Sequence, residues 1–223
     1  MGGISEQELA GRYPRLYHMA EWDAWPSIRQ HGLLSTTALL DLFGIGGEDR
    51  RRIESCHRPK KITISSPNYG KAVIRDQKPM RPATLNRCLS DMSESGWYEL
   101  LNRRVFLWLH ENRLNTLLSA RAYRNERHCV LTFPTGPLLK AYGDTISLSA
   151  LNTGSTLYNP PVRGSRTFCS LATYPFAERH RKAGAQNAIV ELAVDYGIPN
   201  AAELCERAVI MQGAVVLETI FVR

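Results

Sequence analysis

The sequence predicts an α+β fold with a strand-rich C-terminal half, and three observations support that prediction. Apolar residues make up 43% and charged residues 22% of the 223 positions, an ordinary globular composition for a chain able to bury its own core. No linker rich in Pro, Gly or Ser and no internal repeat divides the chain, so we expect one domain over residues 1–223. Candidate strands and helices do not alternate regularly enough for a doubly wound parallel sheet.

The first half of the chain predicts a strand followed mainly by helices. Residues 15–19 have the pattern of a short strand. In the next segment Trp25, Ile28 and Arg29 fall on one helical face, and Gly32 is a natural helix end. Further helices are expected from the Ser-Thr-Thr of residues 35–37 to Leu42, over 47–56 and over 82–101, with strands at 61–65 and 72–74.

The second half predicts most of the strands. Residues 105–109 form a fully apolar run of strand length, which leads into an amphipathic helix over residues 111–123. Residues 152–166 are polar and rich in Gly and Pro, and a loop of that length in a compact domain often carries function. The remaining strands are expected at 129–133, 145–148, 188–194, 208–211 and 215–222.

The charge, the cysteines and the absence of long apolar segments indicate which partners and which cellular compartment to expect. Lys and Arg outnumber Asp and Glu by 28 to 21, so either the basic residues only form a solvated surface or the partner is a polyanion. The five cysteines form no CxxC pair, which favours reduced thiols over a zinc or disulfide framework. We find no signal peptide, myristoylation pattern or membrane-length apolar run, and we therefore expect a cytoplasmic protein without membrane contact.

The common catalytic signatures are absent from the sequence, which contains no P-loop and no GxGxxG, GxSxG or HExxH motif. None of the six histidines has metal-ligand spacing to another, so we expect no metal site. Two residues stand out: His18 lies in an apolar strand near the start, and Glu191 lies in an apolar strand near the end. Taken singly, each could be structural, His18 as a satisfied core histidine and Glu191 as a solvent-facing acid.

Together, three segments resemble the ADP-ribosyltransferase superfamily. The first is the Leu-Tyr-His of residues 16–18, followed by Ser-Ile at 27–28 and His-Gly-Leu-Leu at 31–34. The second is the apolar strand at 104–109 with its helix, and the third is a Glu that opens the strand segment at 191–199 and has a Pro eight positions later. The sequence is similar to DNA ADP-ribosyltransferase toxins, to poly-ADP-ribose polymerase catalytic domains and to uncharacterised bacterial proteins. The resemblance implies a split antiparallel sheet with flanking helices.

The resemblance also implies roles for individual residues. His18 would bind the adenosine-side ribose of NAD, and the Met19 backbone would hold the nicotinamide amide. Breaking the nicotinamide–ribose bond builds positive charge on the ribose, which a carboxylate stabilises, and Glu191 is the candidate, with Glu206 as a rival. The aromatic and basic candidates are Phe106, Trp108 and Tyr123 for stacking on nicotinamide, Arg29 for the pyrophosphate, and Arg121 and Arg124 for the substrate that accepts ADP-ribose.

Three functions remain open from the sequence. The first is an NAD-dependent mono-ADP-ribosyltransferase, in which the basic clusters favour DNA or RNA as acceptor and the resemblance suggests a toxin or defence protein. The second is an enzyme of the same fold that uses NAD to remove a 2′-phosphate from RNA and relies on basic residues in place of Glu191. The third is a nucleic-acid-binding or interaction module without catalysis, because the stacking tyrosine of the family has no clear match in this chain.

Overall fold

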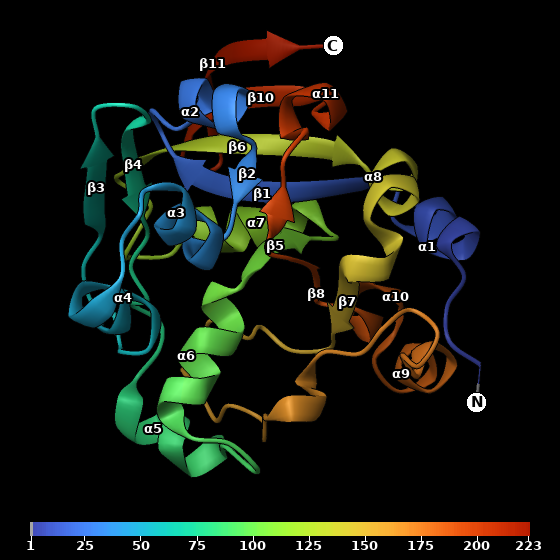
Figure 1. The fold of residues 1–223 in the computed structure, drawn as a ribbon. Coiled ribbons are helices and arrows are strands. Elements are labelled where there is room, and N and C mark those ends of the chain that lie inside the picture. Colours follow the sequence, from blue (N-terminus) through green and yellow to red (C-terminus); the bar gives the residue numbers. More distant parts are fainter. Residues whose placement is uncertain (1) are drawn as a thin grey trace.

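A seven-stranded sheet runs through the centre of the molecule, which confirms the α+β class (Figure 1). The computed structural model describes residues 2–223. The strand order is β11-β10-β6-β1-β5-β8-β7, and neighbouring strands are antiparallel throughout. The strands are β1 (Arg15–Glu21), β5 (Arg104–Trp108), β6 (Arg127–Pro134), β7 (Ile146–Ser149), β8 (Glu191–Asp195), β10 (Arg207–Gln212) and β11 (Val215–Val222).

The sheet is nearly divided in two between β1 and β5. On one side, β1 pairs with β6 along its whole length, from Arg15 opposite Pro134 to Glu21 opposite His128. On the other side, β1 meets β5 at a single pair, Tyr17 opposite Trp108. The four strands from β11 to β1 and the three from β5 to β7 therefore diverge from this contact, and the backbone edges of β1 and β5 are open beyond it.

Two small antiparallel ladders and a set of short helices surround this sheet. β2 (Leu33–Leu34) pairs with β9 (Gly197–Ile198), and β3 (Ile62–Ser66) forms a hairpin with β4 (Gly70–Ile74) at the left of Figure 1. The helices are α1 (Glu6–Arg12), α2 (Trp25–His31), α3 (Thr36–Leu42), α4 (Gly47–Glu54), α5 (Pro82–Cys88), α6 (Glu94–Asn102), α7 (Glu111–Leu118), α8 (Thr135–Tyr142), α9 (Phe176–Ala183), α10 (Ala185–Ala188) and α11 (Ala201–Leu204), with 3₁₀ turns at Gly143–Thr145 and Ser165–Thr167.

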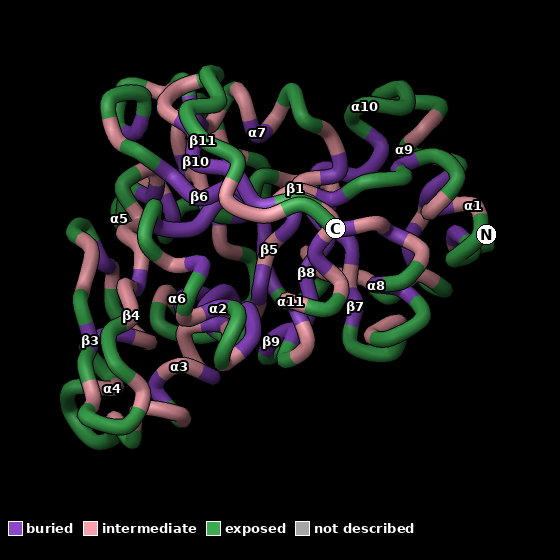
Figure 2. Tube along the Cα trace, turned by 90° about the horizontal axis from the view of Figure 1, so that it is seen from above, coloured by how far each residue is buried: buried purple, intermediate pink, exposed green. Residues whose placement is uncertain are grey.

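Both faces of the sheet are covered by helices. Because strand side chains alternate between faces, Leu16 packs into the main core with residues of α1, α2, α8 and α11, whereas Met19 faces Leu114 and Leu118 of α7. A third cluster around Trp97 joins α5 and α6 to the β5 side of the sheet. Figure 2 shows the result, with the central strands buried and the edge strand β11 mostly exposed.

Most predicted elements are confirmed, including the strands at 15–19, 105–109, 129–133 and 208–211. Gly32 ends α2 as expected: its φ is +88°, and a Cβ there would lie 2.6 Å from Cα of Pro199. The Ser35 side chain caps α3 by accepting the Ala38 N–H, which is the predicted N-cap. The segment at 152–164 contains no helix or strand, in agreement with the predicted loop.

Three predicted boundaries are wrong. The helix expected over 82–101 is two helices, because residues 88–90 instead pair their backbone with Arg163 and Ser93 caps a new helix. The helix expected over 111–123 ends at Leu118, and the chain then turns so that Tyr123 is buried. The strand expected over 188–194 starts at Glu191, because residues 185–188 form the short helix α10. The helices α1, α8, α9, α10 and α11 were not predicted.

Candidate functional site

A cavity of about 1100 Å³ lies where β1 and β5 diverge. Its walls come from segments far apart in the sequence: β1, the α2–β2 turn, β4 and the residues after it, β5, α7, the loop at 152–158, and the first residue of β8. Seven Lys or Arg residues and four Asp or Glu residues line it, so its walls favour anionic groups. His18 and Glu191 both line this cavity.

His18 lies at the point where the sheet opens. Its Nδ1 is 2.8 Å from the carbonyl oxygen of Phe106 on β5, so the side chain spans the gap that the strand backbones leave. A carbonyl can only accept, so Nδ1 carries the proton in this contact. Removal from water and, to a smaller extent, the nearby Arg75 charge lower the pKa of His18 to about 4, against the opposing effect of the hydrogen bond to Phe106. At neutral pH the ring is therefore uncharged, and Nε2 is left as a hydrogen-bond acceptor for a hydroxyl group.

Glu191 opens β8 and is 4% exposed. The Thr153 backbone N–H donates to its carboxylate at 3.2 Å, and the Thr153 hydroxyl donates to Oε2 at 2.6 Å. Burial raises the pKa of Glu191 to about 7, while these two donors and the charges of Arg163 and Arg113 act in the opposite direction. The carboxyl group is therefore poised between its charged and neutral forms near neutral pH, which is a property of many catalytic acids.

The loop that carries Thr153 is anchored by a buried arginine. Arg163 is 2% exposed, and its Nη1 donates to the carbonyl oxygens of Thr153 at 3.1 Å and Ser155 at 2.9 Å. Its guanidinium also lies over the ring of Trp97, with 5.7 Å to the ring centroid. Arg163 thus fixes the loop backbone that supplies both donors to Glu191, although the structure forms no ion pair between Arg163 and a carboxylate among the residues it describes.

The backbone of Met19 faces the open side of β1. Its carbonyl accepts an N–H from Nη1 of Arg75 at 3.4 Å. Because the N–H and C=O of one strand residue point to the same side, the Met19 N–H is directed toward the same opening. An amide ligand at this position would find a backbone donor and acceptor next to His18.

The structure brings most of the predicted site residues together. Phe106 and Trp108 line the cavity from β5, and Trp108 is opposite both Tyr17 and Glu191 in the strand register. Tyr123 also lines it, but Arg75 and Lys78 lie over its ring and its hydroxyl donates to Asp76 at 2.9 Å. Met19 and the exposed Arg121 also line the cavity.

Three sequence candidates lie elsewhere. Arg29 is exposed on α2, and Arg124 is exposed in the turn after α7; neither lines the cavity. Glu206 lies outside the cavity and forms an ion pair with Arg15 at 2.9 Å on the surface. Of the two carboxylates considered from the sequence, only Glu191 shares the cavity with His18.

Sequence reasoning missed the residues that support the site. Thr153, Arg75 and Arg113 line the cavity, and Arg163 stands behind it. The predicted loop at 152–166 contained two of them, but nothing in their spacing pointed to Glu191. Arg75 follows a strand that was expected only as residues 72–74, and its position could be found only from the fold.

The chain matches a model of a protein family over residues 14–205, and that family is described as a family of unknown function, DUF7002. The chain belongs to the DUF7002 family. The match includes His18, Arg75, Thr153 and Glu191, so the family region contains the residues that build the cavity. No curated protein matches the chain.

Two further features of this DUF7002 chain bear on its partners. Within residues 2–223, no helix combines the length and the apolar character needed to cross a membrane. The same residues contain no group of three or more His, Cys, Asp or Glu side chains arranged to hold a metal ion.

Glu191 predicts a measurable dependence of stability on pH. Between about pH 4.5 and about pH 7 the folded protein holds a proton on Glu191 that the unfolded chain has lost, so the free energy of unfolding falls as the pH rises through this window. His18 acts oppositely between about pH 4 and pH 6.5, because folding favours its neutral form. We therefore expect Glu191→Gln to gain stability relative to the wild type as the pH rises toward 7, measured by urea unfolding. Parallel curves for the two proteins would show that Glu191 has an ordinary pKa.

Proposed function

We propose that this chain is an NAD-dependent mono-ADP-ribosyltransferase whose cavity binds NAD. The observation that carries the proposal is the presence of a neutral His18 and a buried Glu191 in one cavity, at the opening between β1 and β5. The volume of about 1100 Å³ slightly exceeds the ~300–1,000 Å³ typical of small-ligand pockets, which suits a ligand as large as a dinucleotide.

The side chains suit the steps of such a reaction. His18 Nε2 would accept a ribose hydroxyl, and the Met19 backbone would bind the carboxamide of nicotinamide. As the bond from ribose C1′ to nicotinamide breaks, its electrons leave with nicotinamide and positive charge develops on the ribose. The Glu191 carboxylate would stabilise that charge, and an acceptor atom would then form the new bond to C1′ and release a proton.

Nucleic acid is the acceptor that the surface favours. The chain has 28 Lys and Arg residues against 21 Asp and Glu residues, and Arg121 is exposed at the cavity wall. Tyr158, in the loop that holds Glu191, also lines the cavity and is 96% exposed, with φ of +56°. An exposed ring at the mouth of a basic cavity is suited to stacking on an unpaired base. The five free cysteines suit a reducing compartment such as the cytoplasm.

Nicotinamide release from NAD by the purified protein tests the proposal. We expect release that increases when single-stranded DNA or RNA is added, together with a mass increase of the nucleic acid by one ADP-ribose. Release of a 2′-phosphate from RNA in the presence of NAD would instead support the phosphotransferase alternative. If NAD is not consumed and does not raise the melting temperature, while nucleic acid binds with a steep salt dependence, the chain is a binding module without this catalysis.

A further inference from the structure

Arg75 is held at the cavity wall by contacts that use little of its hydrogen-bonding capacity. The residue directly follows β4, and Nε of Arg58 donates to its backbone carbonyl at 2.8 Å, which fixes the main chain. The Arg75 guanidinium lies over Tyr123, with 5.1 Å to the ring centroid, and donates one N–H to the Met19 carbonyl. A guanidinium has five N–H donors, so most of them have no partner among the residues that the structure describes.

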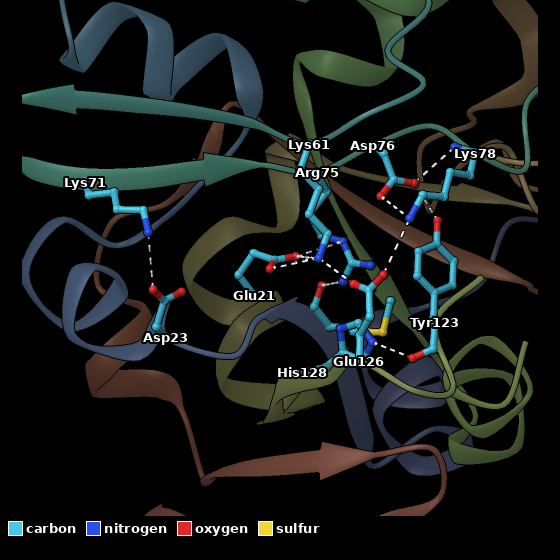
Figure 3. Close-up of polar contacts among 11 residues, drawn as sticks. Glu21, Asp23, Lys61, Lys71, Arg75, Asp76, Lys78, Tyr123, Glu126 and His128 are labelled. Carbon is cyan, nitrogen blue, oxygen red and sulfur yellow. Dashed lines mark hydrogen bonds and ion pairs between the residues drawn. The ribbon is translucent and has the colours of Figure 1, made fainter. Parts of the chain in front are cut away.

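The carboxylate nearest to Arg75 makes its closer contact with a lysine. Nζ of Lys61 lies 2.9 Å from Oε1 of Glu21 and 2.6 Å from Oε2 of Glu126, so Lys61 bridges both acids (Figure 3). Nε of Arg75 is 3.9 Å from Oε1 of Glu21, which is beyond hydrogen-bond distance. Arg75 and Glu21 thus form only a long ion pair, because Lys61 lies closer to this acid, and most of the Arg75 donors remain available to a ligand.

Ion pairs and a hydrogen bond connect the residues around Arg75 on this side of the cavity. Lys78 bridges Asp76 at 3.4 Å and Glu126 at 3.5 Å, and the Tyr123 hydroxyl donates to Asp76 (Figure 3). Tyr123 is therefore a buried, hydrogen-bonded platform under Arg75. A planar guanidinium on an aromatic platform, with its outer donors open, has the geometry that binds two oxygens of a phosphate at once.

We infer that Arg75 is the centre of a phosphate-binding subsite in this cavity, and that its ligand is the diphosphate of a dinucleotide. The diphosphate is favoured over a nucleic-acid backbone because the partly buried Arg75 contacts the Met19 carbonyl next to His18, where a ribose would already be bound. This assignment of the diphosphate rests on the proposed function. It places the pyrophosphate-binding arginine at Arg75, in contrast to the sequence-based candidate Arg29.

Calorimetric titration with ADP, with adenosine and with a single-stranded oligonucleotide tests this subsite. We expect Arg75→Gln to weaken ADP binding by about 10- to 100-fold, because a charge-assisted pair of hydrogen bonds is lost, and to leave adenosine binding unchanged. Arg179→Gln on α9 is the matched control, since it removes one exposed arginine outside the cavity. Equal ADP affinity for Arg75→Gln and wild type, or no ADP binding by the wild type, would overturn the inference. Weaker oligonucleotide binding with unchanged ADP binding would overturn the choice of a diphosphate.

A second pair of variants leaves Arg75 in place and tests the role of Lys61. Lys61→Met frees Glu21 to bind Arg75, so ADP binding should weaken by about 10-fold, and the double variant Lys61→Met/Glu21→Gln should recover most of it. A merely structural role of Lys61 would give no recovery. If ADP binding depends on Arg75 but the protein never consumes NAD, the phosphate subsite is supported and the transferase function is rejected. If the protein consumes NAD and Arg75→Gln leaves the rate unchanged, the transferase function is supported and the subsite is rejected.

Discussion

We expect Glu191→Gln to lower the rate of nicotinamide release by about 100- to 1000-fold, because the carboxylate proposed to stabilise positive charge on the ribose is replaced by a neutral amide. Gln has nearly the same shape and retains one oxygen that can accept from Thr153, so the fold is expected to be kept. The rate is measured as nicotinamide release at saturating NAD, and the melting temperature of each variant is recorded beside it.

Glu206→Gln is the control for this substitution. Glu206 is the other carboxylate that the sequence offered, and it pairs with Arg15 outside the cavity, so its loss should change the rate by less than about 2-fold. Since only the charged form of Glu191 can act, and burial raises its pKa to about 7, wild-type activity should rise as the pH increases through 7. If Glu191→Gln keeps the wild-type rate, the chemistry belongs to the basic residues, as the phosphotransferase alternative requires.

The sequence was most informative where one residue controls local structure. Gly32 and Ser35 have backbone and capping roles that depend on their own chemistry, so both the end of α2 and the start of α3 were predicted correctly. The prediction of one helix over 82–101 is wrong because a residue 73 positions later interrupts it: the backbone N–H of Ser90 donates to the carbonyl of Arg163.

The candidate site shows the same limit. His18 and Glu191 were singular in the sequence because each is a polar residue in an apolar strand, and the structure places both at one cavity. Their supporting contacts could not be predicted in this way. The Thr153 donors, the Lys61 bridge and the Tyr123 platform join segments that are from 38 to 65 residues apart in the chain, and polar loop residues carry no periodic signal.

Arg163→Met is expected to destabilise the protein by about 3 kcal/mol and to slow nicotinamide release by about 10- to 100-fold. The loss of stability follows because the carbonyls of Thr153 and Ser155 lose their buried donor, and unpaired buried acceptors are costly. The loss of rate follows because Thr153 is then free to move, and small displacements of catalytic groups reduce rates strongly. Urea unfolding and steady-state release of nicotinamide measure the two effects, with Arg166→Met as the control, since Arg166 is exposed on the same segment.

The pH profile separates a positioning role of Arg163 from a merely structural one. With Arg163 in place, Thr153 donates two hydrogen bonds to the Glu191 carboxylate, and both favour its charged form. Losing them, together with the Arg163 charge, moves the pKa of Glu191 upward, so the rise of activity with pH should shift to higher pH in Arg163→Met. Thr153→Val, which removes only the hydroxyl donor, should shift it in the same direction by a smaller amount. A variant that unfolds more easily but keeps the wild-type pH profile would show that Arg163 stabilises the loop without acting on Glu191.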